Sequence, residues 1–349
     1  MKTKPQDLET MLTHAASKIV TPKEAKYYAI EVVEAHIRKS PRTNPLNGAV
    51  GDLEKAVEKR ADKISYTIDL PAYFSIDFKE HGPLVYLKRI HDELEKRSSA
   101  NGIAMGAFTN GRSMHTLHTW IQGLAKRGLL AIAVSNGGPG AVVPFNGTRG
   151  LFGTNPLAYG FQGAKGEIHC VDMATSEIPF FEIIAAHAKK EPLQERSAVN
   201  SEGEFTTQVE DALDFSTSET DPQSNIVPMG GGYKGYYIVY LMELLTSALI
   251  GMPSSPEMSD DFIHPEHGSI LLVFNPRAMG TESSFATSVA AIHQALVSQK
   301  PKAGGEIRLP GQYNNAQFLA RKLETIEVDD KLLARIRAIS DRDSLSSVA

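Results

Sequence analysis

Residues 103–134, IAMGAFTNGRSMHTLHTWIQGLAKRGLLAIAV, decide the fold expected of this chain. Residues 103–108 and 129–134 are short apolar runs of the length of a β-strand, and residues 115–126 between them have helical spacing. The stretch therefore predicts a strand, a helix and a second strand, and with them a sheet-bearing lobe in the middle of the chain.

The rest of the chain extends this α/β pattern in both directions. Turns rich in Gly, Asn and Pro separate further strand candidates at residues 157–161, 167–173 and 269–274. Helical periodicity marks residues 6–20, 22–38, 53–64, 85–97, 236–250, 314–323 and 329–339. The Pro, Asn and Gly content of residues 40–51 predicts an irregular loop. We expect the helices of the two chain ends to pack together.

Length and charge exclude several classes of protein. A chain of 349 residues exceeds what one core usually fills, so two lobes are expected. Its net charge of −5 argues against nucleic-acid binding, and its apolar runs are too short to span a membrane. The single cysteine, Cys170, can form neither an intrachain disulfide nor a cysteine zinc site, which favours the cytoplasm.

The histidines do not predict a metal site. His115 and His118 share one helical face, and His264 lies close to His267, but neither pair has a third ligand at a useful spacing. The chain also lacks the Gly-x-Ser-x-Gly elbow of serine hydrolases and the phosphate-binding P-loop. Hydrolase and kinase chemistry are therefore unsupported.

The glycine run GGGYKG at residues 230–235 spells the dinucleotide fingerprint of Rossmann folds. That mechanism needs a buried strand that leads into the loop, but Pro228 lies just before it and cannot donate to a central ladder. A weaker interpretation remains, in which the amides of a helix N-terminus and Lys234 attract an anion. The alternative is a glycine turn with Lys234 in solvent.

Two other segments carry polar groups at strand ends. The run SNGGPG at residues 135–140 lets backbone approach a ligand closely, although a simple connector would use the same residues. The run VDMATS at residues 171–176 offers one acid and two hydroxyls, which either cap a helix or bind ribose and phosphate oxygens.

Seven short motifs follow one another along the chain: 143–145 (VPF), 151–158 (LFGTNPLA), 171–176 (VDMATS), 205–207 (FTT), 232–235 (GYKG), 272–276 (LVFNP) and 307–311 (IRLPG). In this order they resemble the malate/L-lactate dehydrogenase family, which is unrelated to the Rossmann lactate dehydrogenases. The family also includes ureidoglycolate, sulfolactate and diketogulonate oxidoreductases, and reductases of piperideine- and pyrroline-2-carboxylate.

The resemblance implies a homodimeric, NAD(P)-dependent oxidoreductase of small 2-oxo, 2-hydroxy or 2-imino acids, with a non-Rossmann α/β fold. It implies an N-terminal helical and substrate lobe at residues 1–125, a cofactor lobe at 126–285, and a C-terminal helical segment at 286–349 that packs on the first lobe. The implied cofactor-binding residues are Ser135, Asn136, Asp172, Met173, Ala174, Thr175, Ser176, Tyr233, Lys234, Gly311, Gln312 and Tyr313.

The chain departs from the family where acid–base residues are expected. Members carry Ser-His-Gly after the second helix, whereas residues 42–48 read RTNPLNG without a histidine. The position of a second family histidine holds Ser113, with His115 two residues further on. Ser113, His115 and Asn47 are therefore the candidate catalytic residues, and the candidates for gripping a substrate carboxylate are Arg42 and Arg112.

The missing histidines favour a particular substrate. Reduction of a ketone forms an alkoxide that needs a proton donor, whereas an iminium ion arrives protonated and leaves as a neutral amine. We therefore predict an NAD(P)H-dependent reductase of a small 2-imino acid, such as the cyclic pyrroline- or piperideine-2-carboxylate. Two alternatives stay open: a 2-oxo acid reductase in which His115, His118 or His36 donates the proton, and a member that binds nucleotide without turnover.

Overall fold

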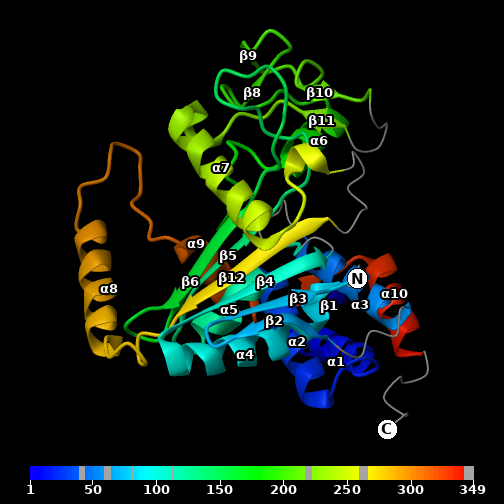
Figure 1. Ribbon diagram of the computed structural model, residues 1–349, viewed down its shortest axis with the longest axis vertical. Coiled ribbons are helices and arrows are strands. Elements are labelled where there is room, and N and C mark those ends of the chain that lie inside the picture. The colour runs from blue at the N-terminus through cyan, green and yellow to red at the C-terminus, as the bar shows by residue number, and fades with distance from the viewer. Residues whose placement is uncertain are drawn as a thin grey trace.

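A computed structural model describes residues 1–38, 44–58, 64–79, 82–111, 114–216, 222–258 and 266–341. A seven-stranded sheet forms its centre, in the order β2-β3-β4-β12-β5-β6-β7 (Figure 1). β3 and β4 are parallel, and every other neighbouring pair is antiparallel. The strands are β2 (Tyr66–Leu70), β3 (Tyr73–Asp77), β4 (Ile103–Gly111), β5 (Leu130–Ser135), β6 (Leu157–Gln162), β7 (Ile168–Met173) and β12 (His267–Phe274).

Helices from both chain ends cover one side of the sheet. They are α1 (Pro5–Ala16), α2 (Pro22–Arg38), α3 (Pro45–Glu58), α4 (Leu87–Asn101), α5 (His118–Ala125) and α10 (Asp330–Ser340). One continuous apolar core joins them to the sheet and contains the fully buried Trp120 and Tyr28. Strand β1 (Lys2–Thr3) pairs with β13 (Ile326–Glu327), and α1 packs on α10. The two chain ends thus form one helical lobe, as predicted.

A second, smaller lobe lies on the other side of the sheet (Figure 1). It contains α6 (Phe180–Lys189), α7 (Tyr233–Thr246) and the short strands β8 (Ala198–Val199), β9 (Phe205–Thr206), β10 (Leu213–Asp214) and β11 (Gln223–Ser224). Met242 of α7 packs on Ala107, Val134 and Ile270 of the sheet. Because side chains alternate along a strand, the same strands present their other face to the helices of the first lobe.

Two helices lie beyond the outer strand β7. Helix α8 (Glu282–Val297) stands apart from the two lobes, and α9 (Gln312–Arg321) packs on α2 and β7 (Figure 1). Most of α8 is exposed, including Ile292 and Val297, and its buried side chain is Val289.

The structure corrects one sequence prediction and adds several elements. The loop expected at residues 40–51 is wrong from Pro45 onward, where α3 begins. Leu46, Ala49, Val50 and Leu53 are all buried on one face of α3, so packing overrides the low helix propensity of Gly48 and Gly51. The hairpin β2–β3 and the helices α6 and α8 were not predicted. Among the described residues, no helix is long and apolar enough to cross a membrane.

Candidate functional site

His115 lies in the loop between β4 and α5, with a positive φ of 57°. Its Nε2 atom lies 2.9 Å from Oδ1 of Asp52 on α3. The Asp52 side chain is only 1% exposed, and its Oδ2 accepts a hydrogen bond from the amide of Leu84 at 3.3 Å. Gly48 lies one helical turn before Asp52, and a Cβ there would stand 2.5 Å from the His115 ring. Helix α3 therefore provides both the partner and the space for this imidazole.

Asn47 neighbours Gly48 and so comes close to the same histidine. Its Oδ1 accepts a hydrogen bond from Arg335 of α10 at 2.8 Å, and Arg335 is also paired with Glu54. Asn47 and His115 thus both lie at the first turn of α3, although the Asn47 side chain is directed to α10 and not to the imidazole. The third predicted catalytic residue, Ser113, and the candidate carboxylate ligands Arg42 and Arg112 lie outside the described residues.

The other two histidines considered as proton donors are poorly suited to that role. His118 is buried, and desolvation together with the nearby Arg38 lowers its pKa to about 3. His36 is buried on α2. His115 has 26% of its side chain exposed and a carboxylate behind it, so it is the histidine of the three that can exchange a proton with a ligand.

Asp172, at the end of β7, connects this histidine to the predicted cofactor segments. Its Oδ2 accepts a hydrogen bond from the amide of His118 at 2.9 Å, at the start of α5. Desolvation raises its pKa from 3.8 to about 6, against hydrogen bonds from the amides of His118 and Leu117 that lower it. Asp172 therefore caps α5, and it ties β7 to the loop that carries His115.

The residues after Asp172 run past the start of α7. Thr175 donates its hydroxyl to the carbonyl of Asn155 at 3.0 Å, and its own carbonyl accepts the amide of Met229 at 2.9 Å. Ser176 forms a β-bridge with Pro228. The segment from Asp172 through Met173, Ala174 and Thr175 to Ser176 thus lies beside the turn that opens α7.

That turn leads to Tyr233 and Lys234, the first two residues of α7, and both are exposed. It is a short 3₁₀ turn, Met229–Gly231, and no strand leads directly into α7. The run GGGYKG therefore matches the Rossmann fingerprint in sequence but not in structure. The amide of Gly230 donates to Oε2 of Glu177 at 2.7 Å, so this turn does accept a carboxylate. Glu177 was not predicted from the sequence.

Gly311 brings the third predicted cofactor segment against β7. It has a φ of 75°, and a Cβ there would stand 2.6 Å from the carbonyl oxygen of Cys170. Gly311 caps α9, which begins with Gln312, and Tyr313 is exposed. Cys170 is two residues before Asp172 on β7. Gly311 therefore packs against the strand that carries Asp172.

Ser135 and Asn136, at the end of β5, belong to a buried polar cluster that the sequence did not reveal. The hydroxyls of Ser135 and Ser269 lie 2.8 Å apart. Asn136 donates its Nδ2 to Oε1 of Glu243 at 3.2 Å. Glu243 also accepts from Nδ2 of Asn155 at 2.7 Å and from the hydroxyl of Ser255 at 2.9 Å. We name Glu243 with Asn136, Asn155 and Ser255 the Glu243 cluster.

Comparison with known proteins places the chain in a family. Residues 4–337 match the family described as malate/L-lactate dehydrogenase. The chain belongs to this family. The resemblance inferred from the seven motifs is therefore confirmed.

Relatives within the malate/L-lactate dehydrogenase family differ in their substrates. The chain is 29% identical to L-sulfolactate dehydrogenase of Methanothermobacter thermautotrophicus over 216 residues, which cover 61% of this chain and 58% of the relative. It is 30% identical to Delta(1)-pyrroline-2-carboxylate reductase of Pseudomonas fluorescens over 256 residues, 70% of each chain. Other relatives are named as NAD(+)- or NADP(+)-dependent dehydrogenases. The chain spans less than two thirds of the length of several of these curated relatives.

The fold extends over nearly the whole chain. Sulfolactate dehydrogenase from Methanocaldococcus jannaschii superposes with a TM-score of 0.78 at 23% identity, over 97% of this chain and 96% of that one. The mixed α/β fold predicted from the resemblance is thus confirmed.

Proposed function

We propose that this protein is an NAD(P)H-dependent oxidoreductase that reduces a small 2-imino acid, such as the cyclic pyrroline- or piperideine-2-carboxylate. The observation that carries the proposal is the hydrogen bond from the amide of His118 to Asp172. It joins the His115–Asp52 pair to the strand against which the predicted cofactor segments lie. A substrate and a cofactor bound on either side of this bond would be neighbours, as hydride transfer requires.

The residues around β7 fit a dinucleotide. Gly311 allows close approach to the backbone of Cys170, and Tyr233 and Tyr313 expose aromatic rings. Lys234 stands at the N-terminus of α7, where the neighbouring turn already binds the carboxylate of Glu177. These groups would hold phosphates and a planar ring. The reduced nicotinamide, when bound, supplies the hydride.

The imino acid is favoured by Asn47 and by one relative. The region where the family resemblance predicts a histidine, residues 42–48, contains none, and the amide of Asn47 in that region cannot serve as an acid. The nitrogen of an iminium ion already carries its proton when the hydride adds to carbon, so the site has only to exclude water and orient the substrate. The relative from Pseudomonas fluorescens is named for a cyclic imino acid.

A second candidate, reduction of a 2-oxo acid to a 2-hydroxy acid, is favoured by the His115–Asp52 pair. The buried carboxylate orients the imidazole at 2.9 Å, so that His115 could protonate the developing alkoxide. Relatives named for sulfolactate support this candidate.

A spectrophotometric assay separates these functions. Oxidation of NADH and of NADPH is followed with pyrroline- and piperideine-2-carboxylate, and with pyruvate and oxaloacetate as controls. We expect turnover with the imino acids. Activity confined to the oxo acids would refute the imino acid and support the second candidate. Tight binding of either dinucleotide without turnover would support a non-catalytic member of the family.

A Lys234→Ala variant should bind the dinucleotide roughly tenfold more weakly.

We also propose that the protein is a cytoplasmic homodimer. Helix α7 exposes an apolar face made of Tyr237, Tyr240, Leu241 and Leu244. A soluble monomer seldom leaves such a face uncovered, and a second copy of the chain is the occupant that we propose. Sedimentation should give a dimer, and Leu241→Glu should shift it to the monomer. A monomeric wild-type chain would refute the dimer.

A further inference from the structure

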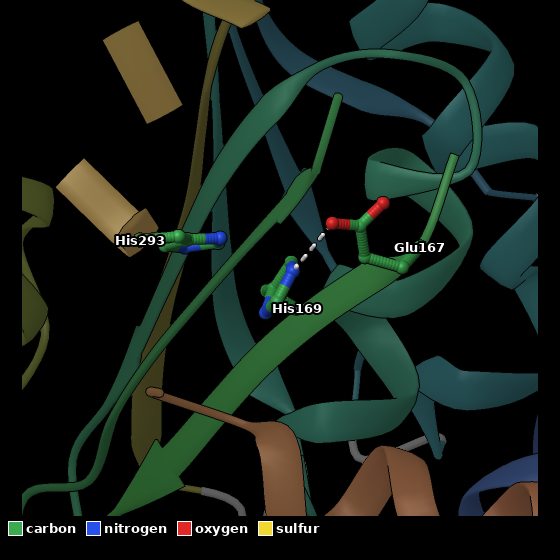
Figure 2. A group of neighbouring side chains, drawn as sticks. All are labelled: Glu167, His169 and His293. Atoms are coloured by element: carbon green, nitrogen blue, oxygen red, sulfur yellow. Dashed lines mark ion pairs between the residues drawn. The ribbon is translucent and has the colours of Figure 1, made fainter. Parts of the chain in front are cut away.

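Three side chains of metal-binding type meet where α8 leans on the edge strand β7 (Figure 2). Glu167 directly precedes β7, His169 follows two residues later on the same face of the strand, and His293 reaches toward them from α8. One ligand atom from each of the three lies within 4.8 Å of the other two. None of these residues belongs to the site proposed above.

The tautomer of His169 is set by its surroundings. The side chain is 5% exposed, and its Nδ1 lies 3.2 Å from the carbonyl oxygen of Pro310. A carbonyl can only accept, so Nδ1 donates to it, and Nε2 points the other way, toward Glu167. Nε2 is buried without a hydrogen-bond partner, and it faces Oε1 of Glu167 at 3.5 Å. A metal ion bound between Nε2 of His169 and Oε1 of Glu167 would give both atoms a partner.

The neighbours of these side chains hold them toward one point. The Oε2 atom of Glu167 accepts the amide of Lys165 at 2.9 Å, which leaves Oε1 turned toward His169. The ring of Phe161 stacks on His169 with centroids 5.1 Å apart. The ring centroids of His169 and His293 lie 4.6 Å apart. A carbonyl behind one histidine and an amide behind the carboxylate are the supports that metal ligands commonly have.

We propose that Glu167, His169 and His293 bind one divalent transition-metal ion of the zinc class. Two imidazoles and one carboxylate form a set that suits Zn²⁺, Co²⁺ and Ni²⁺, with a water molecule as a fourth ligand. A tetrahedral zinc ion holds its ligand atoms roughly 3.3 Å apart, so atoms that lie within 4.8 Å of one another would have to close by up to about 1.5 Å. His293 can make this adjustment because α8 is largely exposed.

The ion would fasten α8 to the sheet. Aromatic contacts from Phe285 and His293 of α8 to Phe161 bring the helix to this edge. Coordination by His293 would replace a weak ring contact with a bond that β7 and α8 share. The same His169 is hydrogen-bonded to Pro310, so the loop before α9 would be held as well.

The test titrates the full-length protein, first stripped with chelator, with ZnCl₂ in a calorimeter and with CoCl₂ in a spectrophotometer. We expect one ion per chain and the intense visible bands of tetrahedral Co²⁺. His293→Gln and Glu167→Gln should each weaken zinc binding roughly tenfold or more. A matched control is His14→Gln, because His14 is exposed on α1 and should leave binding unchanged.

Hydrogen exchange provides an independent readout. Zinc should slow amide exchange in α8 of the wild-type chain and of His14→Gln, but not in His293→Gln. Zinc affinity that is equal in the wild type and in His293→Gln would overturn the proposal. So would a wild-type chain that binds no zinc, since a protonated His169 paired with Glu167 would then explain the same geometry.

Discussion

The Glu243 cluster and the His115–Asp52 pair each centre on a buried carboxylate, yet the two are built differently. Glu243 is 4% exposed, and the groups that donate to it are amides and a hydroxyl of the protein itself. Asp52 is 1% exposed, but the imidazole it holds keeps 26% of its side chain open to solvent.

The difference indicates that Glu243 has a structural role, whereas Asp52 supports a side chain with a chemical role. A carboxylate whose oxygens are both occupied by fixed donors joins segments of chain, and here it joins the ends of the loops after β5 and before β6 to α7. A carboxylate behind a partly exposed imidazole instead supports a group that can meet a ligand. Substitutions in the Glu243 cluster should therefore lower the free energy of unfolding, whereas substitutions in the His115–Asp52 pair should lower kcat.

The largest expected effect is the loss of stability in Glu243→Ala. The substitution removes the acceptor of the side-chain amides of Asn136 and Asn155 and of the backbone amide of Ser255, all in a buried cluster. We expect the free energy of unfolding to fall by about 3–5 kcal/mol, measured by urea denaturation. Glu195→Ala, at an exposed position, is the control and should change it by less than about 0.5 kcal/mol. A small effect at Glu243 would show that the cluster does not hold the loops.

The sequence predicted the elements whose side chains alternate or repeat clearly. Residues 103–134 gave β4, α5 and β5 within a few residues, because apolar runs and a helical stripe coincide with burial there. Helix α3 was missed in its first turns because the glycines concealed a stripe that the core covers. Helix α8 was missed because its apolar side chains, such as Ile292, do not face a core in this chain.

The roles of the candidate site residues stay predictions, and the structure shows only where their segments lie. The motif resemblance selected segments that do meet around β7, and it placed Asn47 and His115 among the candidates. The partner Asp52 could not be predicted, because the contact joins a helix to a loop far along the chain. Glu243 did leave a signal, a single carboxylate in the apolar run of residues 238–245 (IVYLMELL), which needs a buried partner.

The next effect in size concerns the His115–Asp52 pair. His115→Gln keeps a polar side chain of similar length but removes the proton donor. With an oxo acid we expect kcat to fall about 100-fold, and with an imino acid, which brings its own proton, by less than about tenfold. Steady-state kinetics of both substrates measures the ratio. Equal losses on the two substrates would show that His115 does not act as a proton donor, and the unfolding midpoint should stay close to that of the wild type.

The smallest effect concerns Asp172, a third carboxylate to compare with Glu243 and Asp52. Asp172 is half-buried and accepts hydrogen bonds from two backbone amides. Its pKa is raised from 3.8 to about 6 by desolvation, so the folded state holds this proton more tightly than the unfolded state does. The stabilising contribution is fully present below about pH 4, and it is lost as the pH rises through about 6. A shift of this size, discounted for partial exposure, corresponds to about 2 kcal/mol.

Asp172→Asn still accepts the amide of His118 but does not titrate. The difference in unfolding free energy between variant and wild type should therefore grow in favour of the variant by about 2 kcal/mol from pH 4 to pH 7. Urea denaturation across this range measures it, and parallel profiles for the two proteins would contradict the raised pKa.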